Sequence, residues 1–313
     1  MKRAYILIAL YIGICSFAFA NAAKDTPKAD GAITVTTTIF PFYDFTRAIA
    51  GDKANLAMLL PPGAESHSFE PTPRDILTIQ NSDIFIYNGG ESDAWVDRIL
   101  DSTNKPNMKV IRLMDAVDVV EEEIVEGMEE EEAEEEEAEY DEHIWTSPQN
   151  AARIVRAITE ALCEKDRANA GFYQRNADAY IIKLNELDAA FQTVVRNAKR
   201  KTIVFGDRFP FRYFADAYGL SYFAAFPGCS TETECSAATV AFLIDKIRAE
   251  NIPVIFHIEL SNERIADAIA GETGSKKRLL HAVHNISKRD FENGATYLEL
   301  MTRNVDALRD ALQ

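Results

Sequence analysis

A long helical pattern near the middle of the chain limits the folds that this sequence can adopt. From about Phe172 to Ala198, apolar residues recur at spacings of three and four, which indicates an amphipathic helix. The apolar positions are Ala177, Tyr180, Ile181, Leu184, Leu187, Phe191 and Val194. A helix of roughly 27 residues spans on the order of 40 Å. Such a helix is long enough to cross a molecule built of two lobes.

Strand and helix patterns alternate with short links on both sides of this helix. The predicted strands lie at 33–38, 55–60, 83–87 and 109–113 before it, and at 202–205, 221–226, 253–259 and 277–283 after it. Such alternation is typical of parallel α/β sheets flanked by helices. The sequence therefore predicts an N-terminal α/β lobe over 32–165, a linking long helix over 166–199 and a C-terminal α/β lobe over 200–313. Ligands of such sheets bind at the carboxyl ends of strands, here in the cleft between the lobes.

Nearly all of the net charge of −17 comes from one segment, 121–142, in which fifteen of twenty-two residues are Asp or Glu. A like-charge block repels itself, so we expect an acidic disordered loop. It ends at His143, immediately before a helix start at Ser147-Pro148. A further hypothesis is that the loop concentrates divalent cations near the cleft.

The first 23 residues have the order of a signal peptide: Lys2 and Arg3, an apolar run, then small residues. We expect an exported protein, periplasmic or at the cell surface. Cys15 follows Ile14, where a lipoprotein cleavage site would have a small residue, so a soluble protein is favoured over a lipid-anchored one. Cys229 and Cys235 flank a short loop and are predicted to form a disulfide in that compartment.

At least three of the five histidines lie in loops or at strand ends, where ligand sites form. His67 follows the second strand and His143 precedes a helix, while His281 and His284 lie near the end of the last strand. His257 alternates with apolar residues in a strand and is interpreted as structural. Imidazole suits zinc and neighbouring metals, and carboxylates complete such sites. Two carboxylates, Asp207 and Glu259, stand at strand ends and are candidates for that role.

Several motifs resemble the zinc or manganese solute-binding proteins of bacterial ABC importers. They are PPGAESHSFEPTP around His67, DEHIWTSP around His143, YFADAYGL, ETECSA, ETGSKK and the terminal TYLELMTRNVDAL. The resemblance extends from about residue 32 to the C-terminus. It implies two α/β lobes bridged by one long helix, with the metal between them, in agreement with the periodicity.

The resemblance also implies a set of ligands. His67 and His143 match the two histidines of the family's N-terminal lobe. The family's third histidine falls on Asp207 or Arg208, and Asp207 is chosen because arginine stays protonated and cannot bind a metal. The family's late aspartate falls near His281. The predicted metal ligands are therefore His67, His143, Asp207 and His281, with Glu259 and His284 in reserve.

We therefore expect an exported, monomeric, high-affinity zinc-binding protein that delivers Zn²⁺ to a membrane permease and binds no nucleic acid. Three imidazoles and one carboxylate favour zinc, whereas additional oxygens from Glu259 would favour Mn²⁺. A manganese-specific protein of the same type, or a siderophore- or haem-binding protein on a similar scaffold, is the alternative. An enzyme is disfavoured because the sequence contains no HExxH motif.

Overall fold

A computed structural model describes residues 31–103, 105–128, 139–230 and 235–313. The predicted signal peptide and the centre of the acidic segment lie outside these described residues. In the part of the chain that is described, no helix is both long and apolar enough to cross a membrane.

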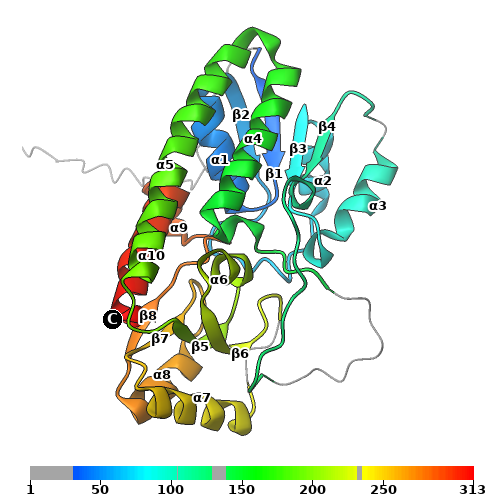
Figure 1. Cartoon of the computed structure of the whole chain (residues 1–313). Coiled ribbons are helices and arrows are strands. Elements are labelled where there is room, and N and C mark those ends of the chain that lie inside the picture. The colour runs from blue at the N-terminus through cyan, green and yellow to red at the C-terminus, as the bar shows by residue number, and fades with distance from the viewer. Residues whose placement is uncertain (1–30, 104, 129–138, 231–234) are drawn as a thin grey trace, which may run out of the picture.

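The N-terminal lobe is built on a parallel four-stranded sheet with the strand order β2-β1-β3-β4 (Figure 1). Its strands are β1 (Ile33–Thr37), β2 (Ala54–Met58), β3 (Ile84–Tyr87) and β4 (Lys109–Arg112). Its helices are α1 (Phe40–Ala50), α2 (Pro73–Gln80), α3 (Trp95–Ser102) and α4 (Pro148–Lys165).

The C-terminal lobe repeats this topology with the order β6-β5-β7-β8, again all parallel. Its strands are β5 (Thr202–Arg208), β6 (Ser221–Phe226), β7 (Val254–His257) and β8 (Lys276–Leu279). Its helices are α6 (Arg212–Tyr218), α7 (Ala237–Glu250), α8 (Arg264–Thr273), α9 (Lys288–Glu292) and α10 (Tyr297–Leu312).

The helix α5 (Ala170–Arg196) has 27 residues and runs along both lobes (Figure 1). It packs against α1 and α4 of the N-terminal lobe and against α6 and α10 of the C-terminal part of the chain. The predicted fold, two parallel α/β lobes bridged by one long helix, is confirmed.

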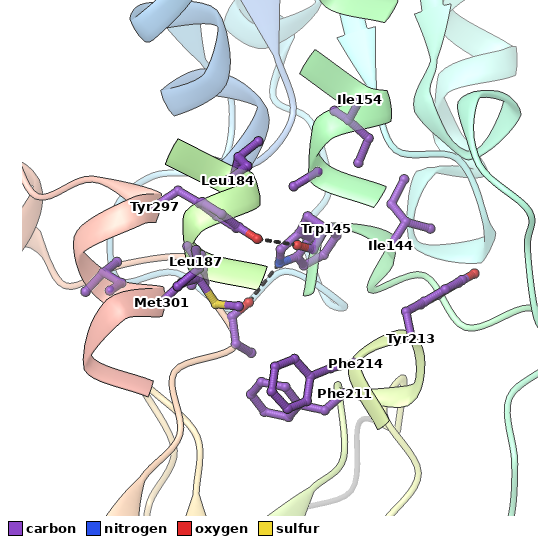
Figure 2. Packing of buried hydrophobic residues seen from close by; sticks show 14 of the residues in the cluster. Ile144, Trp145, Ile154, Leu184, Leu187, Phe211, Tyr213, Phe214, Tyr297 and Met301 are labelled. Carbon is purple, nitrogen blue, oxygen red and sulfur yellow. Dashed lines mark hydrogen bonds between the residues drawn. The ribbon is translucent and has the colours of Figure 1, made fainter. Parts of the chain in front are cut away.

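One apolar core continues across the junction of the lobes (Figure 2). Trp145, which is fully buried, lies at its centre. The Trp145 indole N–H donates to the carbonyl of Ala282 at 2.8 Å, and the Tyr297 hydroxyl donates to the carbonyl of Trp145 at 2.7 Å. These contacts fix the chain beside His143 to the loop that follows β8 and to the start of α10.

Capping residues fix where the helices next to the cleft begin. The Thr72 hydroxyl accepts the Asp75 N–H at 3.4 Å at the start of α2, and the Ser147 hydroxyl accepts the Asn150 N–H at 3.5 Å at the start of α4. A proline follows each cap, as is favourable in the first helical turn. Both predicted helix starts are confirmed.

Parts of the acidic segment are more ordered than expected. We name residues 120–128 the acidic strap, because they leave the N-terminal lobe and run over β6 and α7. The Glu122 N–H donates to the carbonyl of Glu139 at 2.9 Å, and Glu123 accepts a hydrogen bond from the Tyr222 hydroxyl at 3.1 Å. Met128 is buried at the end of the strap. The predicted disorder therefore does not describe the two ends of the segment.

Candidate metal centre

Three imidazole rings converge in the cleft between the lobes. The ring centroids of His67, His143 and His284 are 5.1 to 5.5 Å apart. One nitrogen from each ring lies within 4.8 Å of the others, so the three atoms can bind a single ion.

The three rings come from loops that meet at the carboxyl ends of the strands. His67 follows β2 and His143 precedes α4 in the N-terminal lobe, whereas His284 follows β8 in the C-terminal lobe. Two hydrogen bonds tie the first and last of these loops together across the cleft. The Gly63 backbone N–H donates to the Ile286 carbonyl at 2.8 Å, and the side-chain amide of Asn285 donates through Nδ2 to the Pro61 carbonyl at 2.8 Å.

Each ring has its Nδ1 atom engaged by a neighbouring side chain. Nδ1 of His67 lies 3.0 Å from the Ser92 hydroxyl, Nδ1 of His284 lies 3.1 Å from the Ser66 hydroxyl, and Nδ1 of His143 lies 3.2 Å from the Asp141 carboxylate. Partners of this kind fix the orientation of a metal-binding imidazole. Nε2 is therefore the nitrogen that each ring has available for an ion.

Burial sets the protonation of two of the rings. It lowers the pKa of His67 to about 3, with a smaller effect from the neighbouring charge of His143, and it also lowers the pKa of His284. Burial acts on His143 in the same direction, but the carboxylates of Asp141, Glu142 and Glu122 together outweigh it and raise the pKa of His143. At neutral pH, His67 and His284 are neutral and can bind a cation without first losing a proton.

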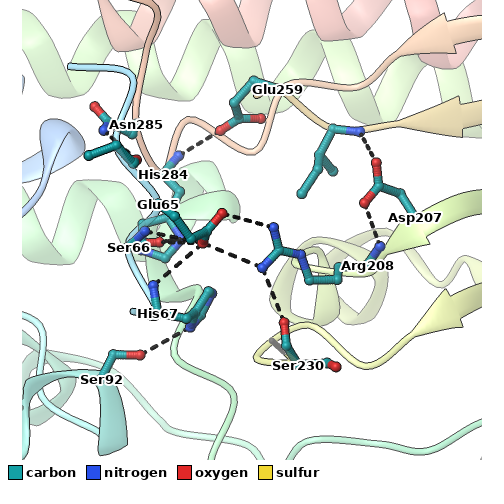
Figure 3. A network of polar contacts seen from close by, with 12 residues as sticks. Glu65, Ser66, His67, Ser92, Asp207, Arg208, Ser230, Glu259, His284 and Asn285 are labelled. Atoms are coloured by element: carbon teal, nitrogen blue, oxygen red, sulfur yellow. Dashed lines mark hydrogen bonds and ion pairs between the residues drawn. The ribbon is translucent and has the colours of Figure 1, made fainter. Parts of the chain in front are cut away.

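A cavity of about 30 Å³ lies against these rings and is also lined by Glu65, Arg208 and Glu259. Its size suits an ion with a water molecule rather than a large chelate. Arg208, at the end of β5, forms an ion pair across the cleft with Glu65, with 3.0 Å between Nη2 and Oε2 (Figure 3). The guanidinium thus lies beside the histidines, at a position where the resemblance implied either Asp207 or Arg208.

Asp207 and His281 do not belong to the group formed by the three rings. The Asp207 carboxylate accepts the N–H groups of Arg208 at 2.9 Å and Ile258 at 3.3 Å, which joins the ends of β5 and β7. Nδ1 of His281 lies 3.3 Å from the Glu259 carboxylate and accepts the Val283 N–H at 3.0 Å. Among the described residues, no group of three metal-binding side chains contains Asp207, His281 or Glu259.

Glu259 supports the loop that carries His284. Its carboxylate accepts the N–H groups of Ala282 at 2.7 Å and His284 at 3.0 Å. The strand β8 ends at Leu279, earlier than the predicted 283, and Val283 adopts a left-handed conformation with φ +61°. The chain turns there, and His284, rather than the predicted His281, joins His67 and His143 in the cleft.

Sequence reasoning did not identify a second group of metal-binding side chains. Ligand atoms of His67, Glu142 and Cys229 also lie within 4.8 Å of one another. Both Cys229 and Cys235 are described, and the structure contains no disulfide between them. Glu142 and Cys229 come together only because the two lobes meet, and no local sequence pattern predicts that contact.

The sequence pattern of the family described as "ZnuA: Zinc-uptake complex component A periplasmic" matches residues 35–311. The chain belongs to this family. It is 34% identical over 309 residues to the "High-affinity zinc uptake system protein ZnuA" of Bacillus subtilis, covering 97% of this chain and 94% of that protein. It is 32% identical over 310 residues to the "Zinc-binding lipoprotein AdcA" of Streptococcus pneumoniae, and here the match spans 99% of this chain but 61% of the relative.

Solved structures of relatives have the same fold. The metal-dependent lipoprotein YcdH of Bacillus subtilis has a TM-score of 0.77 at 32% identity, covering 90% of this chain and all of the other. The Zn(II)-bound ZnuA-like domain of Streptococcus pneumoniae AdcA has a TM-score of 0.75 at 30% identity, covering 90% of this chain and 99% of that domain. The family resemblance that the sequence motifs indicated is confirmed.

Proposed function

We propose that this protein captures a zinc ion between its lobes and delivers it to the permease of an ABC importer. The observation that carries this proposal is the convergence of His67, His143 and His284, whose nitrogens lie within 4.8 Å of one another. The proposal also rests on membership of the ZnuA family and on relatives named as zinc uptake proteins.

The donor atoms favour zinc over manganese. Zinc accepts three imidazoles with one further ligand in tetrahedral geometry, whereas manganese prefers more oxygen ligands. The carboxylates of Asp207 and Glu259 are occupied by backbone N–H groups. Glu65 and a water molecule are the candidates for the fourth ligand, since Glu65 lines the same cavity.

The size of the cavity argues against a siderophore or haem. About 30 Å³ accommodates an ion and not an organic chelate. We infer binding and release without turnover, in keeping with the uptake role named for the family.

We further infer export, with a mature protein that begins after residue 23 and is not lipid-anchored. The order of residues 1–23 supports this inference. Relatives named as lipoproteins make the state of Cys15 the property to measure. Mass spectrometry of the processed protein from its native host decides it, because a diacylglycerol on Cys15 would contradict the inference.

The deciding experiment is metal analysis of the purified mature protein, followed by competitive titration of zinc against manganese. Zinc should be recovered at one equivalent and should outcompete manganese. His67→Ala should lose most of the zinc affinity, whereas Asp207→Ala should keep it. Full zinc affinity in His67→Ala would refute the site.

A further inference from the structure

Cys229 lies beside the three histidines but outside their group. It follows β6 in the C-terminal lobe, is half-buried, and its thiol clusters with His67 and Glu142, two residues of the N-terminal lobe. Ligand atoms of the three side chains lie within 4.8 Å of one another. This group also bridges the lobes, and His67 belongs to both groups.

Glu142 is held firmly in this group. Its carboxylate is almost fully buried and accepts the Ser92 N–H at 2.8 Å through Oε1. Gly90 permits this close packing, since a Cβ at that position would lie 2.4 Å from Oε1 of Glu142. A carboxylate bound through one oxygen has a second oxygen with which to bind a cation.

The loop that carries Cys229 is also held in place by close contacts. The Cys229 N–H donates to Oε1 of Glu122 at 2.8 Å. A Cβ at Gly228 would lie 2.9 Å from the Phe209 carbonyl and 3.2 Å from the Asp141 carboxylate. Glycine at 228 therefore lets the thiol approach the cluster of carboxylates.

Both ends of the acidic segment meet at this group. The Asp141 N–H donates to the Val120 carbonyl at 3.0 Å, so the outgoing and returning chains lie side by side. Glu142 is the last acidic residue of the segment, and Glu122 is near its beginning. A cation attracted by the segment thus reaches Glu142 and Cys229 where the segment joins the cleft.

We propose that His67, Glu142 and Cys229 form a second position for a thiophilic divalent cation, through which the ion passes on its way to or from the three histidines. This inference rests on the proposed zinc-binding function. Thiolate, imidazole and carboxylate are all zinc ligands. On binding, the thiol proton leaves to solvent and the sulfur bonds to the metal. The ion keeps His67 as a ligand while it exchanges Glu142 and Cys229 for His143 and His284, and the released thiolate takes a proton back from solvent.

Co²⁺ tests this position, because a bound thiolate gives a sulfur-to-cobalt charge-transfer absorption in the near ultraviolet that imidazole ligands do not give. His284→Ala removes the three-histidine position but leaves the second one intact. We expect this variant to bind Co²⁺ with the charge-transfer absorption. The absorption should disappear in His284→Ala/Cys229→Ser and persist in His284→Ala/Cys163→Ser, the matched control.

Rapid mixing of Co²⁺ with the unaltered protein gives an independent measurement that needs no cleft variant to fold. We expect a transient charge-transfer absorption before the final spectrum, and its loss in Cys229→Ser. The second position is overturned if neither experiment shows the absorption, or if Cys229 and Cys235 are joined by a disulfide in the isolated protein.

The two proposals fail in different ways. If the unaltered protein binds neither Zn²⁺ nor Co²⁺, the proposed function is refuted as well. If it binds them with no sign of a thiolate ligand, only the second position is refuted.

Discussion

The three clustered histidines are oriented by two kinds of partner. Hydroxyl groups of Ser92 and Ser66 hold His67 and His284, whereas the Asp141 carboxylate holds His143. A carboxylate fixes the tautomer with a proton on Nδ1 and makes the ring a stronger donor through Nε2. His143 is therefore the most basic ligand of the three.

Substitution of His284 should lower zinc affinity far more than substitution of His281, which lies three positions earlier in the chain. We expect His284→Ala to weaken zinc binding by about a hundredfold or more, because removing even an outer-shell partner lowers metal affinity 10- to 100-fold. His281→Ala should change zinc affinity far less, since its ring contacts Glu259 and the backbone of its own loop. Competition against a chromophoric chelator measures both. The reverse order of the two effects would restore His281 as the ligand.

The sequence alone could not decide between these two histidines. Both follow a β pattern, and the pattern does not reveal where β8 ends. The strand ends at Leu279 because the chain must turn to place the N–H groups of Ala282 and His284 on the Glu259 carboxylate, more than twenty residues away. Val283 has a positive φ, which β-branched residues rarely adopt. We attribute this conformation to the tertiary contact with Glu259.

Arg208 should weaken the affinity of the site for cations. Its guanidinium lowers the pKa of both His67 and His284, though less than burial does, so its charge acts on the ligands. Arg208→Ala removes that charge and frees Glu65 from its ion pair. We expect zinc affinity to rise roughly three- to tenfold, where tenfold corresponds to about 1.4 kcal/mol.

Isothermal titration in the presence of a competing chelator measures this change. Arg278→Ala is the matched control, because Arg278 also forms an ion pair, with Asp310, but does not line the cavity. Weaker zinc binding in Arg208→Ala would instead show that the ion pair with Glu65 preorganises the site.

At the scale of elements, local signals predicted helix starts, but not the path of the acidic strap. A capping hydroxyl followed by proline marks α2 and α4 within a few residues of sequence. The strap is held by Tyr213 and Tyr222, about a hundred residues further along the chain. Its charge favours disorder, and only the assembled C-terminal lobe supplies the contacts that order its described part.

Gly127 should be necessary for docking of the acidic strap. It has φ +93°, and a Cβ there would lie 2.1 Å from the Phe242 ring of α7. We expect Gly127→Ala to lower the free energy of unfolding by about 1–3 kcal/mol, through the strained φ and the clash, and to speed hydrogen exchange in residues 120–128. Gly271→Ala in α8 is the control: nothing lies within 4 Å of its Cβ position. It should stabilise the protein by about 0.5–1 kcal/mol.

Asp93, in the short segment after β3, should make the free energy of unfolding depend on pH. The Asp93 carboxyl accepts the N–H groups of Asn88 at 2.8 Å and Gly89 at 3.1 Å. Burial raises the pKa of Asp93 to about 7. Between the unfolded pKa, about 4, and about pH 7, the folded state therefore holds a proton that the unfolded state has lost.

The free energy of unfolding should consequently fall as pH rises through this range, with a contribution of roughly 3–4 kcal/mol from Asp93. Asp93→Asn keeps an acceptor for both N–H groups but cannot ionise, so it should flatten the slope. Urea unfolding at pH 5 and pH 8 measures this for both proteins. Equal slopes would assign the pH dependence to other groups.

At the scale of the whole molecule, both lobes share the largest apolar cluster and one bridging helix. The largest apolar cluster contains buried residues from β1 to α10, whereas each lobe has one smaller cluster of its own, and α5 packs against helices of both lobes. The hydrogen bonds of Trp145 with Ala282 and Tyr297 cross the same junction. A wide hinge opening would expose this core to water, which the hydrophobic effect opposes.

Zinc release should therefore proceed by local movement of the cleft loops, with the lobes in place. The radius of gyration of a compact chain of this length is about 19 Å, and we expect it to differ by less than about 1 Å between zinc-free and zinc-loaded protein. Small-angle X-ray scattering measures it, with His67→Ala/His284→Ala plus zinc as the control that cannot fill the site. A larger change in the unaltered protein alone would mean that the lobes separate, and that the junction around Trp145 opens during transport.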